Sequence, residues 1–248
     1  MKVTVIIPCY NEETNLQKGV LDKIGNYISQ NQSIQEVIIV DDGSSDLSKE
    51  IIRTRYLPLY SHFRLIENPH SGKASAVITG ISQARTPYVF FMDMDLATPI
   101  EETEKLFELA QTFPIVIGSR NNDRKGAPFV RKIMAVGMIF VRNFIIGLKG
   151  IKDTQCGFKF FDRTVALDVL KHLYVFKKSH SVQGSSVSAA FDLEFLFVAQ
   201  KRGYKISEVP VHWRHVETKN VNFIKDSIES LRDILKIKIA DISGKYST

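Results

Sequence analysis

Short runs typical of β-strands alternate with runs typical of α-helices along most of this chain of 248 residues. Strand-like runs, rich in β-branched and aromatic residues, occur at 3–7, 36–40, 63–66, 88–92, 115–118 and 206–213. Helix-like runs occur at 15–28, 72–84, 99–111, 131–148 and 189–202, and Ser45 and Asp46 are candidate caps of a further helix that continues through about Arg55. This alternation predicts an α/β fold in which a central, mostly parallel sheet is flanked by helices on both faces. Ligands of such sheets bind at the carboxyl ends of the strands.

Polar residues follow four of the predicted strands, at the points where those strands end. The groups are Pro8 to Glu12, Asp41 to Asp46, Asp93 with Asp95, and Gly118 to Arg120. Each group alone is typical of an ordinary turn, because Gly, Asn, Asp and Ser dominate turns. Four groups at the same edge of one sheet favour a ligand site over four unrelated turns.

Asp93 and Asp95 come directly after the apolar run 88–92, where unpaired carboxylates are costly to bury. Hard divalent cations such as Mg²⁺ and Mn²⁺ prefer oxygen ligands. We therefore expect the two carboxylates to hold such a cation, and the cation to bind a diphosphate.

The charge balance indicates an anionic partner, since the net charge is +6 and the isoelectric point is about 9.2. Nucleic acid is disfavoured, because the lysines are scattered and no nucleic-acid-binding motif is present. Cys9 and Cys156 form neither a disulfide framework nor a zinc motif, so a reducing compartment is expected. The most apolar stretch, 133–148, is shorter than the roughly 20 residues of a membrane-spanning helix, and none is expected.

Several motifs resemble those of the family 2 inverting glycosyltransferases. They are Ile7-Pro8-Cys9-Tyr10-Asn11-Glu12, Val40-Asp41-Asp42-Gly43-Ser44-Ser45-Asp46 and Asp93-Met94-Asp95. The segments 118–120, 153–159 and 209–211 narrow the resemblance to the branch that moves a sugar onto a polyprenyl phosphate. Segments 93–99 and 153–159 are most similar to those of dolichyl-phosphate β-glucosyltransferases. The resemblance implies a nucleotide-diphospho-sugar transferase fold of the GT-A type.

The same resemblance implies a domain organisation. Residues 1–220 are expected to form one glycosyltransferase domain, with a nucleotide-binding half at 1–120 and an acceptor half at 121–220. Residues 221–248 are expected to form a C-terminal amphipathic helix and a tail, whose apolar face carries Ile224, Ile228, Leu231 and Leu235. Such a helix either packs on the domain or lies on an anionic membrane surface, because basic residues accompany the apolar face.

The resemblance also implies roles for individual residues. Donor binding is expected from Pro8, Tyr10, Glu12, Asp42, Lys73, Asp93 and Arg214. Asp93 and Asp95 would bind the metal, and Asp153 would face the sugar. Arg120 and Arg131 would receive the phosphate of the lipid acceptor. Asp192 and Glu194 stand where many relatives place a catalytic base, so each is interpreted as a base or a sugar contact. Ala97 stands where mannosyl relatives carry a metal-binding Gln, which disfavours mannose and leaves the third protein ligand open.

The implied activity is a Mg²⁺- or Mn²⁺-dependent, inverting transfer of glucose from UDP-glucose to dolichyl or another polyprenyl phosphate. A phosphate acceptor needs no general base, since its second pKa is about 6. Two alternatives stay open: a different nucleotide sugar, such as UDP-N-acetylglucosamine or GDP-mannose, and a glycan acceptor, which would need Asp192 or Glu194 as a base. The lipid acceptor implies a protein that lies peripherally on the cytoplasmic face of a membrane.

Overall fold

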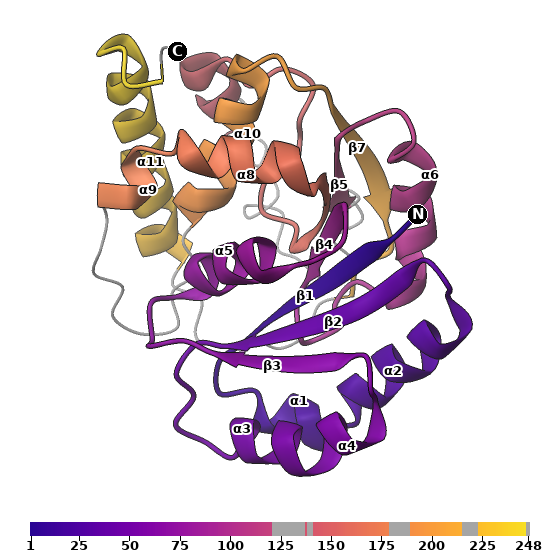
Figure 1. Ribbon diagram of the computed structural model, residues 1–248. Helices are drawn as coiled ribbons and strands as arrows, with labels where there is room; N and C mark the ends of the chain where they lie inside the picture. Colours follow the sequence, from indigo (N-terminus) through magenta and orange to yellow (C-terminus); the bar gives the residue numbers. More distant parts are fainter. Residues whose placement is uncertain (121–136, 138–140, 179–188, 215–222, 247–248) are drawn as a thin grey trace.

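A computed structural model of the protein describes residues 1–120, 137, 141–178, 189–214 and 223–246. Within them, seven strands form one sheet in the order β3-β2-β1-β4-β6-β5-β7 (Figure 1). Neighbouring strands are parallel except at β6, which runs antiparallel to β4 and β5. The mostly parallel sheet predicted from the sequence is confirmed. The strands are β1 (Val3–Cys9), β2 (Ile34–Asp41), β3 (Phe63–Glu67), β4 (Tyr88–Met92), β5 (Ile115–Arg120), β6 (Phe158–Asp162) and β7 (Ile206–Val211).

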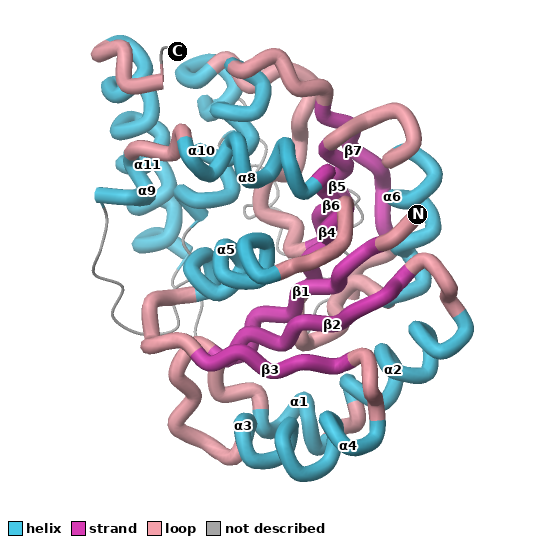
Figure 2. The backbone as a smooth tube through the Cα atoms, viewed as in Figure 1, coloured by secondary structure: helices cyan, strands magenta, loops and turns pink. Residues whose placement is uncertain are grey.

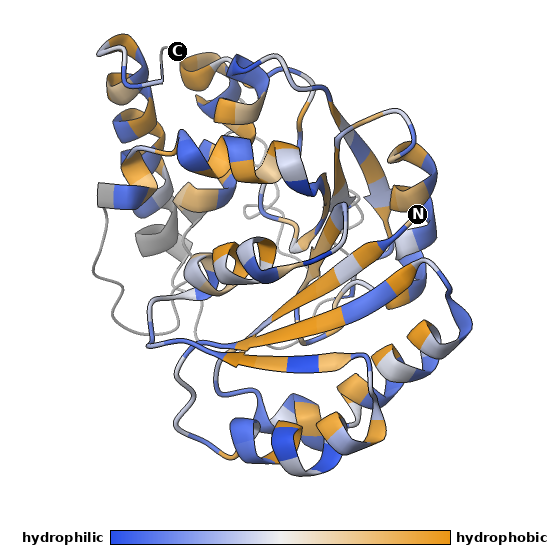
Figure 3. Cartoon of the chain, in the orientation of Figure 1, coloured by the Kyte–Doolittle hydropathy of each residue, from blue (hydrophilic) through white to orange (hydrophobic). Residues whose placement is uncertain are grey.

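Helices cover both faces of the sheet, as Figure 2 shows. One face carries α5 (Lys73–Gln83), α8 (Arg163–Lys171), α9 (Val175–Lys178), α10 (Ala189–Lys201) and α11 (Phe223–Ile242). The other carries α1 (Glu13–Gln17), α2 (Val20–Gln30), α3 (Ser48–Ile51), α4 (Leu57–Leu59) and α6 (Thr103–Leu109). The strands are apolar on both faces (Figure 3): Ile6 packs in one core cluster, and Val5 and Ile7 pack in the other. Strands buried on both faces are typical of parallel sheets.

Three helices predicted as continuous are divided in the structure. The run 15–28 forms α1 and α2 on either side of Gly19, whose φ of 73° interrupts a right-handed helix. The helix predicted to follow Ser45 and Asp46 begins at Ser48, as α3, and continues as a π-helical turn, η1 (Ile52–Tyr56). The run 99–111 begins with a 3₁₀ turn, η2 (Ile100–Glu102), before α6. Half of the residues of the predicted helix 131–148 lie outside the described part of the chain, and residues 137 and 141–146 are helical.

The reversed direction of β6 brings a distant segment to the carboxyl end of β4. Met92, the last residue of β4, pairs with Phe158, the first residue of β6. The residues that precede β6 therefore lie beside those that follow β4, and the Asp93 N–H donates to the Gly157 carbonyl oxygen at 3.2 Å. This pairing places segment 153–157 beside the carboxylate pair singled out in the sequence.

Helix α11 packs on the domain with a different face from the one the sequence predicted to be apolar. Ile234, Ile237 and Ala240 are buried in the cluster that contains α10. The side chains of the predicted face that the structure describes are exposed: Ile228 by 49%, Leu231 by 39% and Leu235 by 45%. Among the described helices, none combines the length and apolarity that crossing a bilayer requires.

Candidate active site

The candidate site lies at the carboxyl ends of β1 and β4. From β1 the sheet extends through β2 and β3 in one direction and through β4 in the other. Chains that leave adjacent strands toward opposite sides open a crevice at the carboxyl edge of a sheet. Asp93 follows β4 at this edge, and Lys73 is the first residue of α5. The Lys73 ammonium forms an ion pair with the Asp93 carboxylate.

Lys73 keeps its charge in this partly enclosed position. Burial by itself lowers the pKa of the ammonium, but the charges of Asp93, Asp192 and Asp95 outweigh burial and raise the pKa above its usual value. The side chain of Lys73 is 22% exposed and that of Asp93 is 37% exposed. Lys73 is therefore a fixed positive charge that neighbours the proposed metal ligands.

Asp95 lies close to other carboxylates, so negative charge exceeds positive charge around it. Its Oδ1 accepts the Ala97 N–H at 2.9 Å, and between them Leu96 has a φ of 50°. Burial raises the pKa of Asp95, and the charge of Asp93 adds to the rise. Burial likewise raises the pKa of Glu12, with contributions from Asp95 and Asp93. A cation would stabilise the ionised form of each of these carboxyl groups.

The carboxylates fit a divalent cation of the Mg²⁺ or Mn²⁺ kind. In the described ranges, no three His, Cys, Asp or Glu side chains converge as a ready-made metal cluster. Magnesium sites in enzymes of phosphate chemistry usually have only one or two protein carboxylates, and phosphate oxygens and water complete them. Asp93 and Asp95 supply that number of carboxylates, and Glu12 adds charge nearby.

Gly157 allows Asp93 to approach segment 153–157 closely. A Cβ at Gly157 would lie 2.1 Å from Asp93 Oδ2, so any larger residue there would displace the Asp93 carboxylate. A pocket opens at this place. Its lining contains Asp93, which was predicted to bind the donor, and Arg120, which was predicted to bind the acceptor. The other lining residues are Ala97, Thr98, Gln155, Cys156, Gly157, Phe158 and Trp213. Trp213 lies beside Arg120, with the guanidinium carbon 5.8 Å from the ring centroid.

Arg120 and Asp153 form a two-pronged ion pair at the acceptor side of this pocket. Arg120 Nε and Nη2 donate to the two carboxylate oxygens at 2.7 and 2.8 Å, and the Arg120 main-chain N–H donates at 3.0 Å. Burial alone raises the pKa of Asp153, but the hydrogen bonds and charge of Arg120 prevail and lower it. The predicted phosphate-binding arginine and the predicted sugar-facing carboxylate are thus partners, and their roles toward ligands stay predictions.

Two further side chains, the partly buried Glu208 and the buried Arg142, hold the segment that carries Asp153. Glu208, on β7, accepts the N–H groups of Lys152 and Asp153 at 2.9 and 2.7 Å. Arg142 is 6% exposed and donates to the Ile151 carbonyl oxygen at 2.7 Å and to Thr154 Oγ1 at 3.1 Å. These contacts hold residues 151–154 in place directly before Gln155, the first residue of this segment that lines the pocket.

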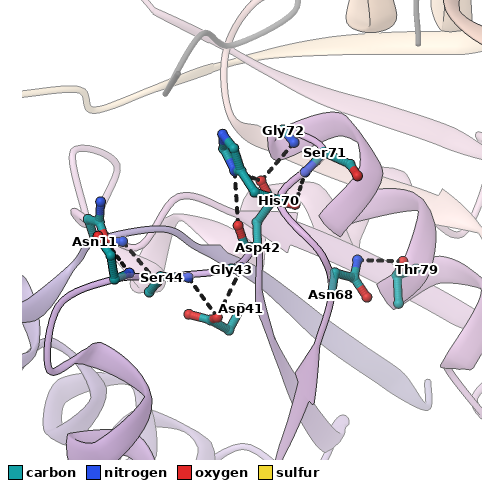
Figure 4. A network of polar contacts seen from close by, with 11 residues as sticks. Asn11, Asp41, Asp42, Gly43, Ser44, Asn68, His70, Ser71, Gly72 and Thr79 are labelled. Atoms are coloured by element: carbon teal, nitrogen blue, oxygen red, sulfur yellow. Dashed lines mark hydrogen bonds and ion pairs between the residues drawn. The ribbon is translucent and has the colours of Figure 1, made fainter. Parts of the chain in front are cut away.

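The loops after β1 and β2 form a second polar network, shown in Figure 4. The Asp42 carboxylate, 1% exposed, accepts hydrogen bonds from Ser71 N–H at 3.0 Å and Gly72 N–H at 2.7 Å, and His70 Nδ1 lies 2.8 Å from it. His70 stacks on Tyr10, with ring centroids 4.3 Å apart. Asp42 thus orders the loop that leads into α5, and its proposed contact with a base is not tested by this arrangement.

Asp41, to which the sequence gave no role, has one carboxylate oxygen that accepts no hydrogen bond in this network. Its Oδ1 accepts the N–H groups of Gly43 and Ser44, while Oδ2 is the buried side-chain atom without a hydrogen-bond partner among the described residues. A buried carboxylate oxygen without a donor is costly. Asp41 is 0% exposed, so this oxygen is enclosed by the protein.

Asn11 joins the two loops. Its backbone has a φ of 53°, a left-handed conformation that Asn tolerates better than most residues. Its N–H donates to Ser44 Oγ at 2.9 Å, and its Oδ1 accepts the Ser45 N–H at 2.8 Å. Pro8 precedes this turn on β1, opposite Val40 on β2.

Asp192 and Glu194 on α10 have different surroundings. Asp192 accepts a hydrogen bond from the buried Lys159 ammonium at 2.9 Å. Glu194 is fully buried and accepts four hydrogen bonds, from the N–H groups of Tyr174, Val175 and Phe176 and from the Tyr246 hydroxyl. Glu194 therefore anchors the start of α9, and this geometry argues against its interpretation as a base or sugar contact.

The two remaining arginines of the sequence prediction are placed differently. The Arg214 N–H donates to the Ala97 carbonyl oxygen at 2.8 Å, so the main chain of Arg214 is fixed beside the turn that follows Asp95, and its side chain is exposed. Arg131 lies outside the described residues. The proposed contacts of both side chains with ligands stay predictions.

Comparison with known proteins settles the family. The profile described as glycosyl transferase family 2 matches residues 4–170. The chain belongs to this family. Glycosyl transferase family 2 includes enzymes of sugar transfer, and this protein is a glycosyltransferase.

Curated relatives of this family 2 chain are similar over almost its whole length. A dolichyl-phosphate β-glucosyltransferase of Trichomonas vaginalis is 35% identical over 254 residues, which cover 96% of this chain and 73% of that protein. The dolichyl-phosphate β-glucosyltransferase of Saccharomyces cerevisiae is 30% identical, with 98% of this chain and 76% of that protein covered.

Solved structures of other glycosyltransferases share the fold. Glucosyl-3-phosphoglycerate synthase from Mycobacterium tuberculosis, in complex with Mn²⁺ and UDP-glucose, has a TM-score of 0.66 at 16% identity and covers 95% of this chain and 78% of its own. Mannosyl-3-phosphoglycerate synthase from Rubrobacter xylanophilus has a TM-score of 0.64 at 14% identity, over 100% of this chain and 76% of its own. The GT-A type fold predicted from the motifs is confirmed.

Sequence reasoning gave no individual role to three residues of this family 2 site, although Asn11 and Lys159 stand within the motif segments 7–12 and 153–159. Asn11 and His70 lie in polar, turn-forming runs, where nothing in the sequence distinguishes a structural residue from its neighbours. Lys159 did carry a recognisable feature, because a lysine between Phe158 and Phe160 interrupts an otherwise apolar strand. A charged residue in such a place requires a buried partner.

Proposed function

We propose that the protein transfers glucose from UDP-glucose to a polyprenyl phosphate such as dolichyl phosphate, with inversion at the anomeric carbon and with Mg²⁺ or Mn²⁺ as cofactor. The observation that carries this proposal is the pocket whose lining contains both Asp93 and Arg120. It brings a carboxylate suited to a cation and a guanidinium suited to a phosphate to the wall of one small space. The names of the relatives support the choice of sugar and acceptor.

The donor side uses residues around the carboxyl edge of β1 and β4. Asp93 and Asp95 would hold the divalent cation, which when bound neutralises the charge of the departing diphosphate as a Lewis acid. Lys73 supplies a further fixed positive charge beside the diphosphate. Tyr10 and the loop ordered by Asp42 would border the nucleotide.

The acceptor side uses the oriented guanidinium of Arg120. Asp153 occupies two of its five N–H donors, so the other three are free of Asp153 and the plane of the group is fixed. An arginine held in this way can bind a phosphate without first losing side-chain freedom. The phosphate of the acceptor is mostly ionised at neutral pH, with a second pKa of about 6, and attacks without a general base.

We further propose that α11 lies on the surface of a membrane, which would be the cytoplasmic face. Its exposed stripe contains Ile228, Leu231, Leu235, Ile239 and Ile242. Arg232 and Lys236 are exposed between these residues, and the chain carries a net charge of +6. An apolar stripe accompanied by basic residues fits an anionic lipid surface, where a polyprenyl phosphate is also found.

The test of the proposed function is transfer of label from UDP-[¹⁴C]glucose to a short-chain prenyl phosphate in the presence of Mn²⁺. We expect label in the organic extract, and none when the acceptor is the corresponding prenyl alcohol, which lacks the phosphate. Asp95→Ala should remove the activity while the far-UV circular dichroism spectrum stays unchanged. Absence of labelled lipid with UDP-glucose, UDP-N-acetylglucosamine and GDP-mannose alike would contradict the proposal.

A further inference from the structure

The carboxylate of Asp153 is fully occupied by hydrogen bonds from the protein. Its Oδ2 accepts the main-chain N–H of Arg120 at 3.0 Å and the Nε–H of the same residue at 2.7 Å. Its Oδ1 accepts from Arg120 Nη2 at 2.8 Å and from the Gln155 N–H at 3.1 Å. A carboxylate offers about four acceptor sites in all. A sugar hydroxyl could therefore bind Asp153 only by breaking one of these hydrogen bonds.

The position of Asp153 sets the direction of the Arg120 guanidinium. The side chain of Asp153 is 12% exposed and that of Arg120 is 24% exposed, so the pair is largely shielded from water. Two parallel N–H···O bonds hold one edge of the planar guanidinium, and such a pair fixes its orientation as well as its place. The N–H groups on the other edges then point where Asp153 directs them.

Glu208 holds the main chain of Asp153. Its Oε1 accepts the Asp153 N–H at 2.7 Å, and its Oε2 accepts the Lys152 N–H at 2.9 Å. One carboxylate thus binds two successive peptide groups. Two such contacts fix the rotation of this piece of main chain, which a single hydrogen bond would leave free.

Glu208 and Arg120 belong to neighbouring strands of the sheet. Strands β5 and β7 are parallel, with Ile117 opposite Glu208 and Arg120 opposite Val211. The segment that carries Asp153 is bound to β7 through Glu208 and to β5 through Arg120. Because strand pairing fixes the spacing of Glu208 and Arg120, the sheet itself determines where Asp153 lies.

We propose that Glu208 is a positioning residue for the acceptor: it holds Asp153, and Asp153 holds the Arg120 guanidinium in the orientation that receives the phosphate. This inference rests on the proposed function, in which Arg120 binds the phosphate of the acceptor. It assigns Asp153 to the acceptor side and replaces the interpretation of Asp153 as a sugar contact. The sequence gave Glu208 no role.

The test is a double-mutant cycle on the binding of a short-chain prenyl phosphate, measured by isothermal titration calorimetry in the presence of UDP and Mg²⁺. The proteins are the wild type, Glu208→Gln, Asp153→Asn and the double variant. Glutamine keeps one acceptor oxygen, but its NH₂ group faces the second N–H. Each single substitution should weaken binding about tenfold, the equivalent of one hydrogen bond to a charged group. The double variant should also lose only about tenfold, because both residues act through Arg120.

Turnover assays show on which substrate the two residues act. Glu208→Gln and Asp153→Asn should each raise the KM for the prenyl phosphate about tenfold and leave the KM for UDP-glucose within about twofold. A contact between Asp153 and the sugar would give the reverse pattern for Asp153→Asn.

The matched control is Gln200→Ala. Gln200, on α10, also makes two hydrogen bonds to the main chain of one residue, Lys149, at 3.1 and 2.7 Å. This variant loosens the chain three residues before Lys152 and should leave the binding of the prenyl phosphate unchanged. Thermal melts of all the variants, followed by circular dichroism, show that each is folded at the temperature of the titration.

Three results would overturn the inference while the proposed function stands. One is an independent effect of the two substitutions, with a loss of about 100-fold in the double variant. Another is wild-type binding of the acceptor by Glu208→Gln. The third is a change in Asp153→Asn confined to the KM for UDP-glucose. Absence of prenyl phosphate binding by the wild type would contradict the proposed function and the inference together.

Discussion

Gly157 shows how one missing side chain makes room for a metal ligand. We predict that Gly157→Ala lowers transferase activity about 100-fold, because a Cβ 2.1 Å from Asp93 Oδ2 must displace the carboxylate and misplacement by about 1 Å costs that much. Initial rates with saturating UDP-glucose and Mn²⁺ measure the effect. Mn²⁺ affinity should fall in parallel.

The matched control is Gly80→Ala, whose Cβ would lie 2.3 Å from Ile6 Cγ2 in the core. This variant should lose thermal stability while the folded fraction keeps its Mn²⁺ affinity. If Gly157→Ala instead keeps full activity, or both variants lose affinity equally, Asp93 does not depend on the space at Gly157.

Asp153 contributes a stability that depends on pH. Arg120 lowers the pKa of Asp153 below its unfolded value of about 3.9, so the contribution is fully present above that pH and is lost as the pH falls through the lowered value. We predict that the free energy of unfolding in urea falls less steeply below pH 4 in Asp153→Asn than in the wild type. Identical slopes in both proteins would show that the pair adds no pH-dependent stability.

At the residue scale, the sequence predicted which side chains lie at the site. It did not predict which of them form pairs with one another. Asp93, Asp95 and Lys73 were predicted from motifs and lie together. That Arg120 binds Asp153 could not be predicted, because it depends on the position of a segment 33 residues further along the chain. Buried pairing is decided by tertiary geometry, which local patterns do not encode.

At the scale of elements, α10 supports α9 through apolar packing, such as that of Phe191 on Phe176, and through the buried carboxylate of Glu194. Glu194→Gln replaces one acceptor oxygen by an NH₂ group, which cannot accept from the N–H groups that point at it. We predict a loss of roughly 2 kcal/mol in the free energy of unfolding, from urea titration, with Mn²⁺ affinity unchanged. Tyr246→Phe removes only one of the four donors and should cost about 1 kcal/mol. A stable Glu194→Gln that has lost activity would restore Glu194 as a catalytic candidate.

Helix α11 carries the proposed contact with lipid. We predict that Leu231→Glu with Leu235→Glu reduces co-sedimentation with vesicles containing phosphatidylserine, because charges on the apolar stripe oppose its insertion. The matched control is Leu59→Glu on α4, which is 59% exposed and far from α11 in the chain. Equal vesicle binding by all three proteins would contradict the proposed membrane surface.

The helices and strands themselves were largely predictable from the sequence, and two properties were not. The apolar pattern of β6 does not predict the direction of the strand, because parallel and antiparallel strands can share that pattern. The face of α11 that packs on the domain was also left open by the sequence, because apolar residues occur on more than one side of the helix. Ile234 and Ile237 are buried, while Leu231 and Leu235, equally apolar, are exposed. Which stripe faces the domain is decided by the shape of α10.

At the scale of the whole molecule, the GT-A fold places donor motifs from the first half of the chain beside segment 153–157 from the second. The reversal at β6 produces this juxtaposition, because it returns the chain to the carboxyl end of β4. One sheet edge thereby holds a carboxylate pair, a fixed lysine and an oriented arginine. This combination suits a reaction between two phosphate-bearing substrates, which repel one another without such charges.

The most direct measurement of the central claim is ¹H NMR of a reaction containing the protein, UDP-glucose, Mg²⁺ and a short-chain prenyl phosphate. The account predicts release of UDP in equal amount to a new glucosyl phosphate whose anomeric proton shows the large coupling of a β-linkage. It also predicts that EDTA stops the reaction and that excess Mg²⁺ restores it. A product with α-linkage, or UDP-glucose consumed only by hydrolysis to free glucose, would contradict inverting transfer to a lipid phosphate.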